Sequence, residues 1–331
     1  MAERDACHDG LMSIVPYDEF GLFAQNVQEF GLDVSPSPTV RRVEVPLTSD
    51  PNRSISALVW GDEAPVLVFI HGGAQNAHTW DTVALALGMS LVAVDLPGHG
   101  RSGWREDGAY TPANLAADVA DAVRLLAPHA AAVVGMSLGG ITSIELACQH
   151  PELVRQLMLV DITPGVNAHK AKAVTDFVNG PQTFPSFDEL LARTIEHNPT
   201  RSESSLRRGI LHNAHQTGDG SWEWNYDRRS HARTREVEAD TETSRAVASP
   251  DNTEIAFNPL WDRLESLQSP VTLLRGSLSP VVDDADVAEA RRRQPTIRVE
   301  VVDGAGHSIQ GDRPLEMAAL IREILLTKPI V

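Results

Sequence analysis

The sequence contains few cysteines and no long apolar run. Its 331 residues include only two cysteines, Cys7 in a polar N-terminal tail and Cys148 in an apolar helical pattern, so we expect no bridge between them. No stretch of about 18 apolar residues occurs, and the N-terminus lacks the basic and apolar segments of a secretory signal. These absences predict a soluble cytoplasmic protein that has no membrane partner.

Basic residues are also scarce. Lys and Arg number 28 against 45 Asp and Glu, which gives a formal net charge of -17. Such a charge repels phosphate backbones and anionic lipid head groups. The metal-binding patterns H-x-H-x-D-H and H-E-x-x-H do not occur. The charge argues against a nucleic-acid partner, and the missing patterns argue against a metal site. We also expect a small-molecule substrate and no cofactor.

Short apolar runs alternate with helical patterns along most of the chain. The strand-like runs are residues 42–47, 55–60, 66–70, 91–95, 131–135, 157–161, 271–274 and 297–302. Helical patterns cover residues 79–87, 111–126, 139–150 and 314–326. Nearly continuous apolar runs are typical of strands buried on both faces. The alternation predicts an α/β protein with a mainly parallel sheet covered by helices, and the first two runs are a candidate antiparallel pair.

The pattern divides the chain into three parts. Residues 1–40 are expected to form a tail and a helix, and residues 41–164 and 259–331 the α/β core. The polar stretch 165–258 interrupts the alternation and is expected to be a mostly helical cap. An aromatic group in this stretch either lines an apolar substrate pocket or packs the cap, and it consists of Trp222, Trp224, Tyr226 and His231.

A serine lies where a buried strand turns directly into a helical pattern. The strand 131–134 leads into Gly135-Met136-Ser137-Leu138-Gly139, the G-x-S-x-G context of a nucleophile elbow. A sharp strand-to-helix turn needs small residues beside its centre, and Gly135 and Gly139 provide them. The following helix N-terminus favours the negative charge that develops during attack. We therefore predict that Ser137 is a nucleophile.

These features resemble the α/β-hydrolase superfamily, in the branch of small esterases, carbon-carbon bond hydrolases, cofactor-free haloperoxidases, epoxide hydrolases and haloalkane dehalogenases. Three further segments carry the resemblance: His71-Gly72-Gly73, the turn from Asp95 to Ser102, and Gly304-Ala305-Gly306-His307. The resemblance covers residues 45–163 and 260–328. It implies an eight-stranded, mainly parallel sheet flanked by helices, with the cap inserted after the sixth strand.

The resemblance also implies roles for particular residues. His307 stands where the family carries its catalytic base, and the backbone N–H groups of Gly73 and Leu138 stand where it forms an oxyanion hole. Epoxide hydrolases and haloalkane dehalogenases use an Asp nucleophile, whereas this chain has Ser137. A serine suits acyl transfer, in which an imidazole accepts the hydroxyl proton and N–H groups stabilise the oxyanion.

The acid that orients the base is less directly indicated. The family usually places it in a Gly-x-x-Asp turn after the seventh strand, but this chain has Gly276-Ser277-Leu278-Ser279 there. Some small esterases of the superfamily carry the acid in a turn similar to Asp161-Ile162-Thr163-Pro164, and we prefer Asp161. Asp283 or Asp284, or a Ser-His pair without an acid, remain as alternatives.

We therefore expect a serine hydrolase that cleaves a carboxylic ester or lactone through an acyl-enzyme. The same three residues also suit a carbon-carbon bond hydrolase or a cofactor-free perhydrolase. A third hypothesis is a ligand-binding protein that keeps the fold without catalysis. Retention of the serine, the histidine and the oxyanion loop favours an enzyme.

Overall fold

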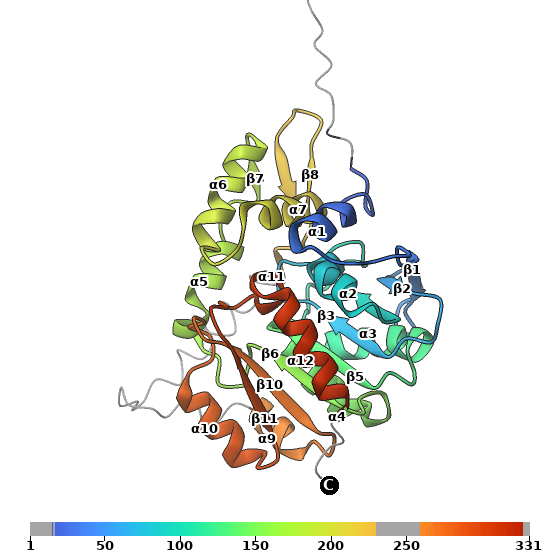
Figure 1. Ribbon diagram of the computed structural model, residues 1–331, viewed down its shortest axis with the longest axis vertical. Coiled ribbons are helices and arrows are strands. Elements are labelled where there is room, and N and C mark those ends of the chain that lie inside the picture. Colours follow the sequence, from blue (N-terminus) through green and yellow to red (C-terminus); the bar gives the residue numbers. More distant parts are fainter. Residues whose placement is uncertain (1–14, 16, 230–258, 327–331) are drawn as a thin grey trace, which may run out of the picture.

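A central sheet of eight strands dominates the structure, a computed structural model that describes residues 15, 17–229 and 259–326 (Figure 1). Cys7 and His231 lie outside the described residues. The strands are β1 (Val40–Pro46), β2 (Ser54–Trp60), β3 (Leu67–Ile70), β4 (Leu91–Val94), β5 (Ala132–Met136), β6 (Leu157–Val160), β10 (Val271–Gly276) and β11 (Arg298–Val302). Each contains or closely matches one of the predicted apolar runs.

The sheet has the order β1-β2-β4-β3-β5-β6-β10-β11. β2 pairs antiparallel with both β1 and β4, and every other pair is parallel. The predicted mainly parallel sheet is thus confirmed. Because the carboxyl ends of parallel strands meet at one edge, the loops after β3, β5, β6, β10 and β11 come together there.

Helices cover both faces of the sheet, and each face has its own apolar core. One face carries α1 (Phe23–Phe30), α2 (Asp81–Leu87) and α12 (Pro314–Leu326). The other carries α3 (Pro112–Leu126), α4 (Leu138–Gln149), α9 (Pro259–Ser266) and α10 (Asp284–Arg293). Short helical turns complete the core: η1 (Ala77–Trp80), η2 (Pro151–Leu153) and α11 (Ile309–Asp312).

The cap segment, by which we mean residues 165–229, follows β6. Its elements are α5 (Ala168–Val178), β7 (Thr183–Phe184), α6 (Phe187–His197), α7 (Glu203–Asn213), β8 (Ala214–Gln216) and β9 (Trp222–Trp224). The three strands form an antiparallel sheet in the order β7-β9-β8, which the sequence did not predict. They are two, three and three residues long, too short to show a period of two.

The aromatic residues of the cap segment pack inside it. Trp222, Trp224 and Tyr226 are buried, and they share an apolar cluster with side chains of α5, α6 and α7. Of the two interpretations that the sequence left open, packing is the one observed. These rings therefore hold the cap segment together around its small sheet.

The N-terminal helix α1 contacts both the core and the cap segment. Its Phe23 ring lies 4.8 Å from the Trp60 ring, and its Glu29 carboxylate pairs with Arg208 of α7. Helix α1 also packs on α2. The segment before β1 thus fastens the cap segment to one face of the core.

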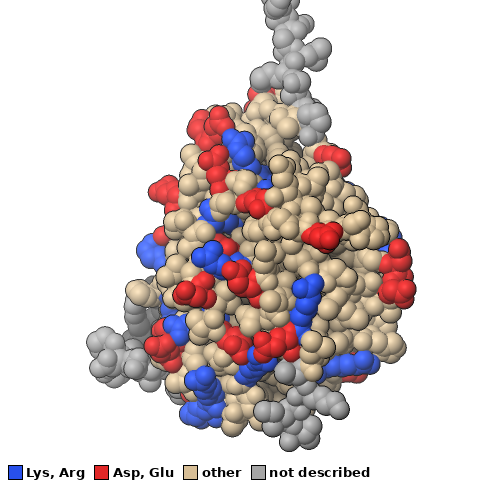
Figure 2. Space-filling model, viewed as in Figure 1, with Lys and Arg blue, Asp and Glu red and all other residues tan. Residues whose placement is uncertain are grey.

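Acidic and basic side chains are interspersed on the face shown in Figure 2. Among the described residues, opposite charges form ion pairs, such as those of Arg298 with Glu300 and Glu323. No broad basic area is visible on this face. Within the part of the chain that the structure describes, no helix is long and apolar enough to span a membrane.

Candidate active site

Ser137 occupies the turn between β5 and α4, with a positive φ of 52° and a ψ of -119°, a strained combination for a residue other than glycine. The turn is tightly enclosed. A β-carbon at Gly139 would collide with the carbonyl oxygens of Ile70 and His71, and one at Gly135 would collide with the Gly139 backbone. The Ser137 N–H donates to the carbonyl of Val160 at 3.2 Å, which ties the turn to β6. Glycine is therefore required on both sides because the backbone approaches so closely.

Left-handed backbone marks this edge of the sheet. Among the described residues other than glycine, a positive φ occurs at Ala74, Ser137 and Asp161. These three follow β3, β5 and β6, so they lie at the carboxyl ends of adjacent strands. Backbone held in this region costs about 1–3 kcal/mol per residue, and such residues cluster at functional sites.

Asp161 is fully buried directly after β6, and three groups bind its carboxylate. Its Oδ2 atom lies 2.8 Å from Nδ1 of His307 and accepts a hydrogen bond from the Ser279 hydroxyl. Its Oδ1 atom accepts the Gly276 N–H at 3.0 Å. A buried carboxylate needs such partners to offset the loss of water. The donors come from β10 and the loops after β10 and β11, so Asp161 joins three separate segments.

His307 lies in the loop after β11, and its side chain is 13% exposed. The Gly306 N–H donates to Oδ2 of Asp312 at 2.8 Å, and the same oxygen accepts the hydroxyl of Thr200 from the cap segment at 2.8 Å. Asp312 of α11 thus binds both the His307 loop and the cap segment, which fixes the loop between them. His307 and Ser137 line the same cavity.

The two alternative acids have other partners. Asp283 caps α10 by accepting the Asp286 N–H, and it pairs with Lys170. Asp284 forms an ion pair with Arg275, and its side chain is 97% exposed. The structure therefore places His307 beside Asp161 and engages Asp283 and Asp284 elsewhere.

The loop after β3 lies against the serine turn. A β-carbon at Gly72 would lie 3.2 Å from Cβ of Ser137, and Gly73 lines the cavity that contains Ser137. Leu138 is the first residue of α4, so its N–H has no acceptor within the helix. Two predicted oxyanion donors therefore flank the serine from different segments.

The buried His71 ring braces this loop. Its Nδ1 atom donates to the Gly72 carbonyl at 2.7 Å, and its Nε2 atom accepts the Leu96 N–H at 2.8 Å. Burial lowers the pKa of His71, although the Asp95 carboxylate opposes the shift. A neutral ring with one donor and one acceptor nitrogen matches both hydrogen bonds.

The cap segment holds the other end of the loop. Asn213, at the end of α7, donates from its amide to the carbonyl of Ala74 at 2.6 Å. In return, the Asn76 amide donates to the His212 carbonyl at 2.9 Å. Sequence patterns gave no signal for Asn213, because its partner is distant in the chain. They marked Ser279 as the residue in the expected acid position but did not predict its bond to Asp161.

A cavity of about 310 Å³ opens above Ser137 and His307. Residues of both the core and the cap segment line it. Phe177 and Val178 of the cap segment and Leu278 of the core supply apolar walls, and Gly73 lies beside the serine. This volume is at the small end of ligand sites, which typically span about 300–1,000 Å³. The site thus joins Ser137 and His307 to a small, largely apolar chamber.

The fold and this site define the class of the protein. A family model described as the alpha/beta hydrolase fold matches residues 65–314, and the chain belongs to that family. The chain is 42% identical to "Esterase Rv0045c" of Mycobacterium tuberculosis over 318 residues, which cover 94% of this chain and 97% of the relative. A solved structure of that esterase, reported with its transition-metal inhibition, matches 94% of this chain and 99% of its own with a TM-score of 0.78 at 41% identity.

A more distant relative is a "2-(acetamidomethylene)succinate hydrolase" of Mesorhizobium japonicum. It is 29% identical over 253 residues, which cover 76% of this chain and 84% of the relative. The family match confirms the resemblance drawn from the serine turn and the glycine-rich loops.

Replacing Ser279 with Ala is expected to lower the free energy of unfolding by about 1.5–3 kcal/mol, because it removes a hydrogen bond to a buried carboxylate. Chemical denaturation measures the change. The comparison variant is Ser277→Ala, whose exposed hydroxyl in the same turn contacts the Gly304 N–H and the Asp303 carboxylate rather than Asp161, and it is expected to cost about 0.5–1.5 kcal/mol. Equal effects of the two substitutions would contradict the bond between Ser279 and Asp161.

Proposed function

We propose that this chain hydrolyses carboxylic esters through an acyl-enzyme, with Ser137 as nucleophile, His307 as general base and Asp161 as the orienting acid. One observation carries the proposal: His307 Nδ1 lies 2.8 Å from the buried Asp161 carboxylate while the His307 ring borders the cavity of Ser137. An oriented base next to a serine at a strained turn is the arrangement that acyl transfer requires.

The reaction follows from these positions. Asp161 accepts the Nδ1–H of His307, which leaves Nε2 as the basic nitrogen. Nε2 accepts the hydroxyl proton as Ser137 Oγ attacks the ester carbonyl, and the imidazolium then gives this proton to the departing alcohol. A water molecule, deprotonated by the same nitrogen, attacks the acyl-serine and releases the carboxylic acid and free Ser137.

The oxyanion of each tetrahedral intermediate needs donors. We assign these to the N–H group of Leu138, which directly follows Ser137, and to that of Gly73, which lines the same cavity. Loss of one such donor typically costs about 3 kcal/mol of transition-state stabilisation. The hydrogen bonds from Asn213 to Ala74 and from Asn76 to His212 keep the Gly73 loop in place.

Similarity to known hydrolases supports the reaction class. The 42% identical relative is named an esterase, and the 29% identical relative is named for a hydrolase reaction on a small organic acid derivative. We infer a small-molecule substrate. We also propose that residues 165–258 form a cap over a core made of residues 41–164 and 259–331, and that the protein acts in the cytoplasm.

The chamber of about 310 Å³ favours short acyl groups. We expect p-nitrophenyl acetate and butyrate to be hydrolysed with higher kcat/KM than p-nitrophenyl laurate, because a short acyl group leaves room in a cavity of this size for the alcohol part of the ester. Ser137→Ala should abolish turnover of all three. Faster turnover of a vinylogous diketone, or peroxide-dependent oxidation with acetate, would instead identify a carbon-carbon bond hydrolase or a perhydrolase.

Asp161→Asn is expected to lower kcat by about 10⁴-fold, because an amide no longer holds His307 in the required tautomer. The matched controls are Asp283→Asn and Asp284→Asn, which should leave kcat near the wild-type value. Steady-state kinetics on p-nitrophenyl butyrate measures all three. If Asp161→Asn retains activity and either control loses it, the orienting acid is Asp283 or Asp284 at the start of α10, and not Asp161.

A further inference from the structure

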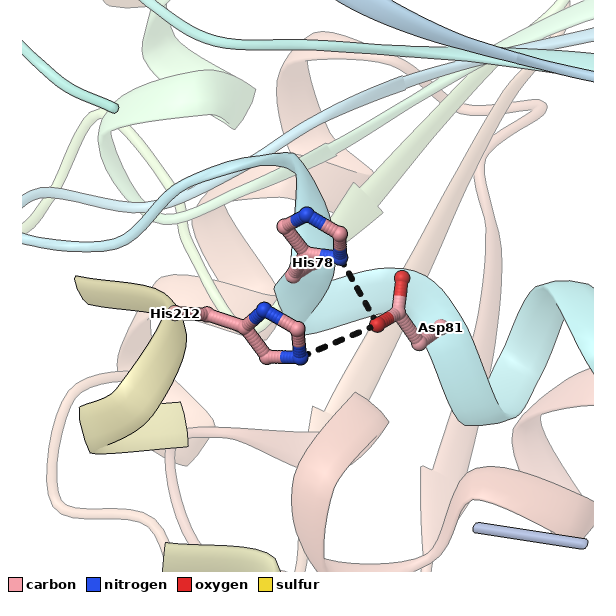
Figure 3. Close-up of side chains that lie close together, drawn as sticks. All are labelled: His78, Asp81 and His212. Atoms are coloured by element: carbon pink, nitrogen blue, oxygen red, sulfur yellow. Dashed lines mark hydrogen bonds and ion pairs between the residues drawn. The ribbon is translucent and has the colours of Figure 1, made fainter. Parts of the chain in front are cut away.

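A second cluster of ionisable side chains lies outside the proposed active site. His78 of η1, Asp81 at the start of α2 and His212 at the end of α7 converge where the core meets the cap segment (Figure 3). All three are buried. One carboxylate oxygen, Oδ2 of Asp81, lies 2.9 Å from Nδ1 of His78 and 3.5 Å from Nε2 of His212. The mechanism proposed above uses none of these groups.

We propose that His78, Asp81 and His212 form a binding site for a divalent transition-metal ion of the zinc type, which joins the core to the cap segment. Two imidazoles and a carboxylate are a donor set that zinc-like ions prefer over calcium or magnesium. One potential ligand atom from each residue lies within 4.8 Å of the other two. Tetrahedral zinc with bonds of about 2.0–2.1 Å separates its donors by about 3.4 Å, between the two distances to Asp81.

The surroundings of the histidines match those of metal ligands. A coordinating histidine usually donates its other ring N–H to a carboxylate or another acceptor, which fixes the ring. Nε2 of His78 lies 3.1 Å from Oε1 of Glu19, and Nδ1 of His212 lies 2.6 Å from the Tyr17 hydroxyl. Each ring therefore already has a partner for the nitrogen that would not bind the ion. Both partners come from the segment that precedes α1.

An unpaired carboxylate oxygen of Asp81 also supports a cation site at this cluster. Oδ1 of Asp81 is buried and has no hydrogen-bond partner among the described residues. The Asp81 side chain is only 3% exposed, so water does not readily compensate this atom. A bound cation would satisfy both oxygens of the carboxylate at once.

One rearrangement accompanies binding. The His78 and His212 rings are stacked, with centroids 3.8 Å apart and planes inclined by 8°. Imidazole lone pairs lie in the ring plane, so a shared ion requires one ring to tilt. Cavities of about 110 and 270 Å³ lie beside the cluster, and both are lined by His78 and His212. They give room for the tilt and a path for the ion.

The charged groups around the cluster affect how strongly it binds an ion, and protons compete with the ion for the histidine nitrogens. Burial and the neighbouring His78 lower the pKa of His212. Burial also opposes protonation of His78, but Asp81 and Glu19 outweigh it and raise the pKa of His78 to about 9. Arg42 lies 3.4 Å from Nε2 of His78 and repels a cation, whereas Asp81 and Glu19 attract it.

The sequence patterns used to search for metal sites do not point to this cluster, so the proposal departs from the expectation of no metal. His78 and Asp81 are three residues apart, and His212 follows more than a hundred residues later in the cap segment. Only folding brings the three together.

Isothermal titration of the chelator-treated full chain with ZnCl₂ tests the site. We expect one ion per chain, and a rise in the unfolding temperature because the ion binds only the folded state. His212→Asn and Asp81→Asn should weaken binding by more than about 100-fold, and Tyr17→Phe by about 10- to 100-fold as an outer partner. His215→Asn is the matched control, because it alters an exposed histidine three residues further on, and it should bind like the wild type.

Cobalt absorption on the wild-type chain gives a second measurement that needs no variant to fold. We expect intense visible bands of a four-coordinate nitrogen and oxygen site, without the near-ultraviolet charge-transfer band of a cysteine ligand. The absence of stoichiometric binding to the wild type, wild-type affinity in both His212→Asn and Asp81→Asn, or a sulfur charge-transfer band would each overturn the proposal. MgCl₂ should produce neither heat nor stabilisation.

Discussion

The buried carboxylate of Asp161 is the constraint on which the proposed active site depends. It has no exposure to water, so its charge is compensated by the Gly276 N–H, the Ser279 hydroxyl and the His307 ring. Those donors come from separate segments that meet only because β6, β10 and β11 run parallel and adjacent. Satisfying one carboxylate therefore fixes the position of the histidine relative to the serine turn on β5.

Ser279 lies in the turn after β10, where the family resemblance leads us to expect the acid. It donates a hydrogen bond to Asp161, our proposed acid, which follows the neighbouring strand. The two positions lie close together because β6 and β10 are paired. A carboxylate at both positions would place two like charges side by side in a buried site, which is unfavourable.

Much of the fold was predictable because it is encoded locally. Buried strands produce continuous apolar runs, and the glycines around Ser137 reflect contacts within a single turn, so the sheet and the serine turn could be recognised from the sequence. The His307 position followed from its glycine-rich loop after the last strand. Asp161 could be preferred over Asp283 and Asp284, but only the structure shows which carboxylate lies beside His307.

The remaining features depend on contacts between distant segments. The cap strands are too short to leave a periodic pattern, and the bond from Asn213 to Ala74 joins residues that are far apart in sequence. The same holds for His212 beside His78 and Asp81, one residue before Asn213 in the chain. The end of α7 thus contacts both the loop that borders Ser137 and the proposed metal site, so the cap segment contributes to two sites at one junction.

The central claim is that Ser137 is an activated nucleophile, and covalent labelling tests it most directly. After treatment with a fluorophosphonate probe, mass spectrometry of peptides should find one adduct per chain, on the peptide that contains Ser137, in step with the loss of ester hydrolysis. An unlabelled chain that still hydrolyses esters, or an adduct on a different serine, would contradict the account.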